Sequence, residues 1–476
     1  MQTHSDRLLL GRLRSGLRSA GKDYRPSAVI PFSILIPIIL FLYFDLSTQL
    51  WFLKLSGGHL LRIWIPPLIL FVALVCVKLW KSDMPIPLDW QTVMLAVYAI
   101  VSLMTLFANE EPYYALKYWL IMVAPIWIYF VILDTCGKSA HIERILKCLF
   151  FGGFALILYT VYLQWLNVNN PGDVIREVTT RSGQVIQIAG ESFYKEKGTE
   201  YSRGFLPYSC SQYSGILLFP CLYGIYFFLN SRTWMRWLFL LISLLMISQI
   251  INTLSRTDFA VVGTGLIILW GSLAYEGTIE KKRLALVFLL LFAGIGFYIV
   301  FFKPILIGRI LQMFTFLGIK SLNTHLLVEG FMPEAHINMP DPHIVSAMAS
   351  IQALMENPIQ GLGFTYAEQQ VGELNRYLFI LISSGVVTFL AYTLFWCGLI
   401  YSIGRAMIKT KRARLSPQLG PYVMACCIAL MLKFIYVGLE VFYYWIIGSL
   451  AMAWVYSIVK SPAVSGLHVI KQNITD

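Results

Sequence analysis

Apolar stretches long enough to cross a lipid bilayer recur along this chain and are separated mostly by short polar connections. A hydrocarbon core about 30 Å thick requires about 20 apolar residues in a helix, and this criterion predicts about twelve membrane-spanning helices. The composition agrees, because 13% of the residues are charged, whereas soluble domains have about 25%. The predicted spans are 28–46, 61–80, 89–107, 114–133, 145–166, 207–229, 234–254, 257–275, 284–302, 377–403, 421–438 and 441–459.

Lys and Arg are concentrated in every second connection between these spans, for example in 134–147 and 404–420. Positively charged connections remain in the cytoplasm, so both termini are predicted to be cytoplasmic. Residues 1–27 are predicted to form a basic amphipathic segment, with a disordered tail as the alternative, and 461–476 a cytoplasmic tail. The concentration of Lys and Arg in the connections predicted to be cytoplasmic explains the net charge of +12. This charge therefore does not indicate binding of nucleic acid. The predicted fold class is an all-α, polytopic membrane helix bundle formed by residues 28–303 and 376–460.

Two connections are long, 167–206 and 304–375, and both fall on the opposite, periplasmic side of the predicted bundle. A structureless loop of about 70 residues is unusual, and long loops in compact proteins are usually functional. Residues 344–355 have apolar residues at helical spacing and stop before Asn357 and Pro358, so we expect the second connection to form a helical periplasmic cap. This asymmetry indicates an enzyme that works on one face of the membrane.

Arginines at the outer ends of the spans are the main candidates for substrate binding. Arg256 begins one span, and Arg203 lies where the first long connection re-enters the membrane. An Arg at a membrane boundary is costly unless it snorkels or has an anionic partner, and a guanidinium can bind phosphate bidentately. We therefore predict that Arg203 and Arg256 bind a lipid-linked diphosphate, with Arg309 as a weaker third candidate. The alternatives are an ion pair of Arg256 with Asp258 and interfacial anchoring by Arg203.

Candidates for a general base lie in the second long connection. His343 can accept a proton from a sugar hydroxyl, and Glu373 is one of several carboxylates that can do the same. Neither the histidines nor the eight cysteines have the spacing of a metal site, so no metal and no cofactor are predicted. Within the predicted membrane, Lys433 and Glu440 are interpreted as a structural ion pair.

Four short motifs resemble those of a known family. Residues 356–364 are similar to an NPxxGxG turn, and 374–378 align with an HNxxL motif. Residues 385–388 follow at the matching spacing, and Ser255-Arg256 closes one span and begins the next. Together these motifs, which lie within roughly 200–400, resemble the superfamily of bacterial O-antigen polymerases and O-antigen ligases.

The resemblance implies a GT-C-like fold in the bacterial inner membrane and a glycosyltransferase that is independent of metal. Its substrate would be an undecaprenyl-diphosphate-linked oligosaccharide at the periplasmic leaflet, bound in part by Asn375, Arg376 and Tyr377. A chain-length regulator and a flippase of the same pathway are the implied protein partners. Leu374 stands where the family motif has His, so the general base stays open between His343 and Glu373.

Two alternatives to a polymerase remain at this point. An O-antigen ligase would transfer the finished glycan from the same carrier to lipid A-core, and the sequence separates it from a polymerase only through Leu374. A lipid-linked glycan flippase or another transporter would have functional polar residues near the bilayer midplane. The midplane of the predicted bundle is nearly bare of charge, which favours an enzyme.

Overall fold

A computed structural model describes the helical core of the chain and four short strands. The described residues are 30–44, 61–81, 86–87, 89–105, 112–169, 176–179, 185–188, 193–196, 199–202, 210–253, 255–277, 279–302, 350–355, 357–364, 366–367, 376–412, 419–434 and 442–459. The chain divides into two compact units, of which unit 1 comprises 1–145 and 341–476, and unit 2 comprises 146–340.

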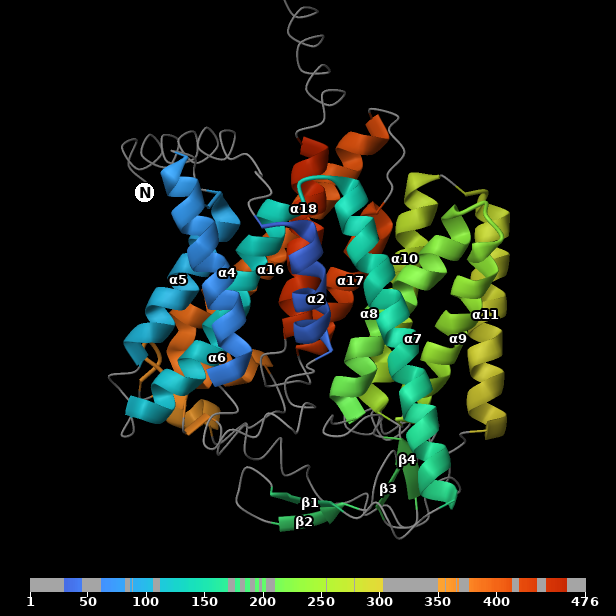
Figure 1. Cartoon of the computed structure of the whole chain (residues 1–476), viewed down its shortest axis with the longest axis horizontal. Coiled ribbons are helices and arrows are strands. Elements are labelled where there is room, and N and C mark those ends of the chain that lie inside the picture. Colours follow the sequence, from blue (N-terminus) through green and yellow to red (C-terminus); the bar gives the residue numbers. More distant parts are fainter. Residues whose placement is uncertain are drawn as a thin grey trace, which may run out of the picture. The chain divides into compact units, whose positions relative to one another are not determined.

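Unit 1 is built around α16, which packs against α5, α17 and α18 (Figure 1). Helix α6 packs against α4 and α18, and α18 also contacts α2. The helices of unit 1 are α2 (Phe32–Tyr43), α4 (Leu61–Trp80), α5 (Trp90–Met104), α6 (Pro112–Thr135), the first turns of α7 (Ser139–Asn169), α16 (Arg376–Arg412), α17 (Gly420–Lys433) and α18 (Phe442–Val459).

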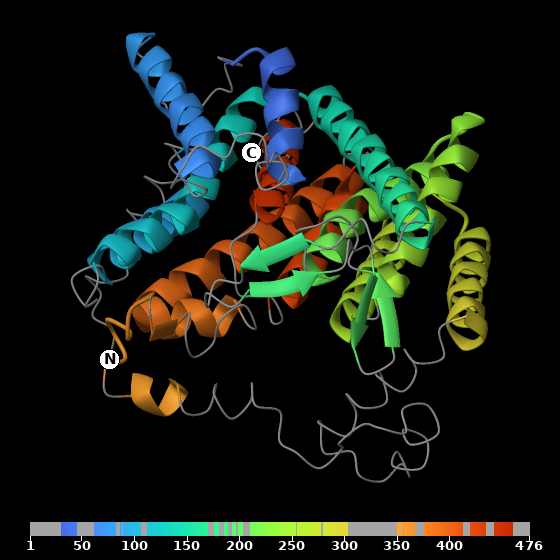
Figure 2. The ribbon, with the colours of Figure 1, turned by 60° about the horizontal axis from the view of Figure 1, so that its bottom comes forward.

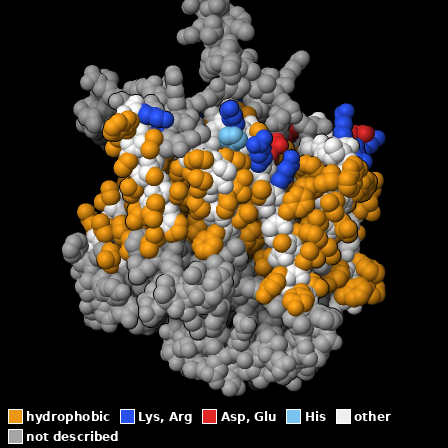
Figure 3. Space-filling model, viewed as in Figure 1, with side chains coloured by type: hydrophobic (Ala, Val, Ile, Leu, Met, Phe, Trp, Pro, Cys, Tyr) orange, Lys and Arg blue, Asp and Glu red, His pale blue; other side chains and the backbone are white. Residues whose placement is uncertain are grey.

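Unit 2 contains the remainder of α7 and two antiparallel helix pairs. Helix α8 (Cys210–Asn230) packs against α9 (Met235–Asn252), and α10 (Arg256–Glu276) contacts α8, α9 and α11 (Lys281–Phe302). Because short turns connect α8 to α9 and α10 to α11, the basic residues of these turns lie at one end of unit 2. Hydrophobic side chains cover the visible sides of the helices (Figure 3).

Two of the helices, α5 and α10, begin where a polar side chain caps the first turn. Asp89 precedes α5 and accepts a hydrogen bond from the backbone N–H of Thr92 (2.7 Å). Ser255 has the same role at α10, where it accepts from the N–H of Asp258 (3.4 Å). At the other end of α10, Gly277 has φ 71°, the left-handed conformation of a helix C-cap. Local sequence signals therefore set these helix ends.

The described helices coincide with the predicted spans, one helix for each span. Six of them are long and apolar enough to cross a membrane, and the other apolar helices are shorter among the described residues. The helices are therefore those of a membrane helix bundle, the coarse form of the prediction. The number of crossings, about twelve, and the orientation of the termini stay predictions.

The first long connection contains strands that the sequence analysis did not predict. β1 (Arg176–Thr179) pairs with β2 (Val185–Ile188), and β3 (Phe193–Glu196) pairs with β4 (Thr199–Ser202), both antiparallel. Figure 2 shows the two hairpins as separate pairs of arrows. In the second long connection, the helical residues 350–354 end before Asn357, as predicted, whereas most of the predicted cap and the two terminal segments lie outside the described residues.

Helix α16 is interrupted at Gly385, whose φ of 77° and ψ of 177° are not helical. The turn 357–363 lies against this interruption and bonds to the backbone groups that it exposes. Leu362 N–H donates to Ile382 O (2.7 Å), Gly363 N–H to Ser383 O (3.1 Å), and Val386 N–H to Pro358 O (2.9 Å). We call residues 357–363 and 382–386 the turn–helix joint.

Two glycines allow the turn–helix joint to form, and both belong to the motifs found in the sequence. A Cβ atom on Gly361 would lie 2.6 Å from the backbone N of Gly385, and one on Gly385 would lie 2.0 Å from Ile359 O. Both glycines have positive φ, which residues with a side chain rarely adopt. Close backbone contact thus explains Gly361 in the NPxxGxG turn and Gly385 in α16.

Substitution of either glycine by alanine should therefore destabilise the protein. Gly361→Ala and Gly385→Ala each force an unfavourable φ, which costs about 1–3 kcal/mol, and displace the opposing backbone. The midpoint of thermal unfolding of the purified protein in detergent should fall for both variants. Gly271→Ala in α10 is the matched control, because a Cβ there has nothing within 4 Å. Equal midpoints for Gly385→Ala and Gly271→Ala would contradict the joint.

Candidate functional site

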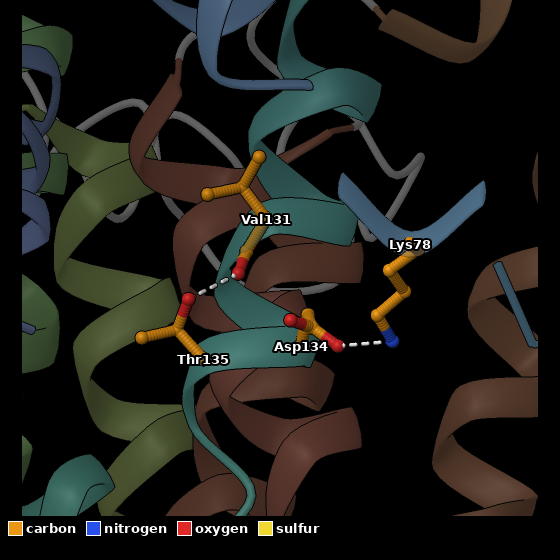
Figure 4. Close-up of polar contacts among 4 residues, drawn as sticks. All are labelled: Lys78, Val131, Asp134 and Thr135. Carbon is orange, nitrogen blue, oxygen red and sulfur yellow. Dashed lines mark hydrogen bonds and ion pairs between the residues drawn. The ribbon is translucent and has the colours of Figure 1, made fainter. Parts of the chain in front are cut away.

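Polar side chains tie the helices together at one end of unit 1, where Lys and Arg are also found. Lys78 on α4 forms an ion pair with Asp134 on α6 (2.5 Å), and both side chains are fully buried (Figure 4). Tyr456 on α18 donates to the carboxylate of Asp89 at the start of α5. These contacts connect α4 to α6 and α18 to the start of α5 at the basic end of the unit.

The ion pair corrects the sequence analysis, which assigned Asp134 to the polar connection 134–147 and gave Lys78, near the end of the span 61–80, no partner. The structure instead buries both inside the helical unit. Gln91 extends this set of contacts, because its Nε2 donates to Ser402 Oγ on α16 (2.6 Å). Burial of a charge is tolerated when its partner is close and hydrogen-bonded.

Removal of one partner of this pair should destabilise the protein strongly. Asp134→Asn removes the charge that balances the buried ammonium of Lys78, which should lower the free energy of unfolding by about 3–5 kcal/mol. The double variant Lys78→Met/Asp134→Leu removes both charges and should recover most of this loss. Thermal unfolding in detergent measures both effects, with Thr135→Val as the control, since the Thr135 hydroxyl bonds within α6 to Val131 O (2.9 Å). A double variant less stable than Asp134→Asn would contradict the assignment.

At the opposite end of unit 1, Arg376 is the first residue of α16 and is 1% exposed. Its Nη2 donates to the hydroxyl of Tyr98 on α5 (3.2 Å), and its backbone N–H donates to Phe434 O (2.7 Å). The guanidinium carbon lies 5.7 Å from the ring centroid of Tyr392 and 5.9 Å from that of Phe379. Arg376 is thus surrounded by aromatic rings, at distances where cation–π attraction is appreciable.

The aromatic side chains around Arg376 continue across the unit. Tyr377 packs on Tyr392 and Phe434, with ring centroids 6.4 Å and 5.9 Å apart, and its hydroxyl donates to Met431 O (3.4 Å). The ring centroid of Phe434 lies 5.0 Å from that of Tyr444 on α18. We call Tyr98, Arg376, Tyr377, Tyr392, Phe434 and Tyr444 the arginine–aromatic cluster.

Two further buried tyrosines and a lysine extend the polar character of this end. Tyr443 lies 4.2 Å from Tyr444 and 5.9 Å from Tyr43 on α2, measured between ring centroids. Lys433, the last residue of α17, is 1% exposed. Transfer of polar side chains from water is unfavourable, so a guanidinium, a lysine and several phenols buried at one end of the unit are more than apolar packing requires. Such a set can bind an anion and hydroxyl groups.

The arginine–aromatic cluster also has a purely structural interpretation. Arg376 connects the start of α16 to α5 through Tyr98 and to α17 through Phe434, and buried aromatic pairs stabilise helix packing. A structural role predicts that changes at Arg376 act on stability alone. A role in substrate binding predicts loss of activity in variants that retain the fold.

The predicted site residues fall into three groups. Arg376 and Tyr377 lie together in the arginine–aromatic cluster. Arg256 is the first residue of α10 in unit 2, next to the capping residue Ser255 and near the buried Asp258, but its side chain is outside the described part. Arg203, Arg309, His343, Glu373 and Asn375 lie outside the described residues.

The sequence analysis did not identify Tyr98, Tyr392 or Phe434 as neighbours of Arg376. Each lies within an apolar run in which aromatic residues are common, so no local signal distinguishes it. Lys433 was interpreted as the partner of Glu440, which lies outside the described residues. Among the described residues, no group of His, Cys, Asp or Glu could hold a metal ion.

Comparisons of the whole sequence add no further evidence for a family. No protein-family model matches the chain, and no curated protein matches it. The resemblance to O-antigen polymerases and ligases therefore rests on the short sequence motifs alone.

Proposed function

We propose that this protein is a glycan polymerase of the bacterial inner membrane. It would join undecaprenyl-diphosphate-linked oligosaccharide repeat units into O-antigen or another surface polysaccharide, on the periplasmic face. The observation that carries the proposal is the meeting of three motif segments in unit 1. Residues 357–363 dock on the interruption at 385–388, and the half-helix between 376 and the interruption carries Arg376 into the arginine–aromatic cluster.

In the proposed reaction, the bond between the anomeric carbon of the donor sugar and its diphosphate breaks. A new bond forms from that carbon to a hydroxyl oxygen of the acceptor repeat unit, and the hydroxyl proton moves to a general base, His343 or Glu373. Arg203, Arg256 and Arg309 would stabilise the charge that grows on the diphosphate. Asn375, Arg376 and Tyr377 would bind and orient the sugars.

The interrupted helix also bears on the transporter alternative. Discontinuous membrane helices are typical of transporters, where the unwound backbone lines a substrate cavity. In this protein, backbone N–H groups of the turn 357–363 donate hydrogen bonds to the carbonyl oxygens of Ile382 and Ser383, next to the interruption. In addition, the middle of unit 1 is packed by large rings, among them Phe395 and Trp445 with centroids 5.5 Å apart. Both observations favour a rigid support for a binding site over a transport path through unit 1.

Loss of the proposed arginine contacts should abolish polymer formation. We expect Arg203→Ala, Arg256→Ala and Arg376→Ala each to reduce transfer by on the order of 100-fold or more, with loss of the ladder of polymer lengths on a gel of cell-surface polysaccharide. Arg376→Lys should restore little, because an ammonium lacks the planar fork of the guanidinium. Arg405→Ala, at the exposed other end of α16, is the control and should leave the ladder intact.

The same gels separate the polymerase from the ligase. Loss of the ladder with retention of lipid A-core that carries a single repeat unit indicates a polymerase, whereas loss of all capped lipid A-core indicates a ligase. Membrane levels and thermal unfolding of each variant show whether Arg376→Ala acts through stability alone. A normal distribution of polymer lengths in a strain with Arg256→Ala would contradict the proposed diphosphate site.

A further inference from the structure

The turn between α8 and α9 combines exposed basic and aromatic side chains. Trp234 is 75% exposed and Trp237 is 57% exposed. Arg232 is exposed and Arg236 is half-buried on the same turn. None of the residues from 230 to 247 is acidic, so this segment carries a charge of about +2 from its two arginines.

Hydrogen bonds fix the shape of this turn. Asn230 Nδ2 donates to Tyr226 O (3.0 Å), and the backbone N–H of Thr233 donates to Ser231 Oγ (3.2 Å). The hydroxyl groups of Ser231 and Thr233 are 2.8 Å apart and bonded to each other. Arg232 lies between these two residues, on a turn whose conformation is set by its neighbours.

Arg236 is held by an aromatic ring. Its guanidinium carbon lies 5.2 Å from the ring centroid of Trp237, and Trp237 in turn packs on Phe228 at 5.1 Å. A cation–π contact of this kind orders the side chain without using its N–H donors. Those donors therefore stay available for an anion near the ring.

An exposed apolar strip extends along α9 from this point. Leu241, Leu244 and Leu245 follow Trp237 at spacings of four, seven and eight residues, which puts all four on one helix face. Leu241 is 57% exposed, Leu244 42% and Leu245 41%. The strip thus begins at the two arginines and continues along the helix as a surface for hydrocarbon.

We propose that the α8–α9 turn and this strip form a binding site for one anionic phospholipid. Arg232 and Arg236 bind the negatively charged phosphate of the headgroup, Trp237 lies at the level of the glycerol backbone, and an acyl chain follows the leucines. The site discriminates against zwitterionic lipid because the two positive charges of the segment, which has no carboxylate, repel the ammonium of a zwitterionic headgroup. Each basic residue near an anionic lipid surface is worth about one kcal/mol. The proposal is independent of the polymerase activity.

Native mass spectrometry of the full-length, detergent-purified protein tests this site. Phosphatidylglycerol and phosphatidylcholine with the same acyl chains are titrated separately, and retained lipid is counted. We expect tighter retention of phosphatidylglycerol by the native protein. The variant Arg232→Gln/Arg236→Gln should bind phosphatidylglycerol on the order of 30-fold more weakly, because the free energies of the two arginine contacts add. Trp237→Ala should also weaken it.

The control variant is Lys281→Gln/Lys282→Gln, which removes the same charge from exposed positions at the start of α11. It should retain phosphatidylglycerol normally. Equal losses in the two double variants would reduce the effect to general charge and overturn the proposal, as would equal retention of phosphatidylcholine by the native protein. Displacement of the lipid by millimolar inorganic phosphate would overturn it in favour of a site for the free ion.

Discussion

A helix that stops in the middle of an apolar run exposes backbone N–H and C=O groups, and these must be bonded because hydrocarbon offers no partner. In α16 the interruption at Gly385 meets this requirement through the turn 357–363, whose backbone bonds to Ile382, Ser383 and Val386. The short half-helix from Arg376 to the interruption thereby has a fixed position. The arginine–aromatic cluster depends on that position, since Arg376 reaches Tyr98 and Phe434 from the start of the half-helix.

The two ends of unit 1 differ in the kind of polar group that they bury. At the basic end, the opposite charges of Lys78 and Asp134 neutralise each other, and Tyr456 bonds to Asp89. At the other end, Arg376 lies among phenols and phenyl rings, with Lys433 buried nearby. One end is therefore suited to hold the helices together. Under the proposed function, the other end receives the anionic, hydroxyl-rich lipid-linked sugar.

The sequence predicted the positions of the helices well, because the length of an apolar run and a capping residue such as Asp89 or Ser255 are local signals. It also singled out Gly361, Gly385 and Arg376 through motifs, but it could not show that the first two touch, since contact between distant segments leaves no local pattern. The ion pair of Lys78 and Asp134 was missed for a related reason. Each residue lies near the end of an apolar run, where a charge normally faces water.

The strands β1 to β4 were missed because strands of four residues are too short to show a clear hydrophobic alternation. The candidate bases could not be ranked either, because the choice between His343 and Glu373 depends on distances to the acceptor hydroxyl that no spacing in the sequence determines.

The most direct test of the central claim is an assay of the purified protein with undecaprenyl-diphosphate-linked repeat units in detergent, with a chelator present. We predict that glycan chains of two or more units accumulate on the lipid and that one undecaprenyl diphosphate is released for each new linkage. A substrate that stays unchanged, in protein preparations whose thermal unfolding shows a native fold, would contradict it.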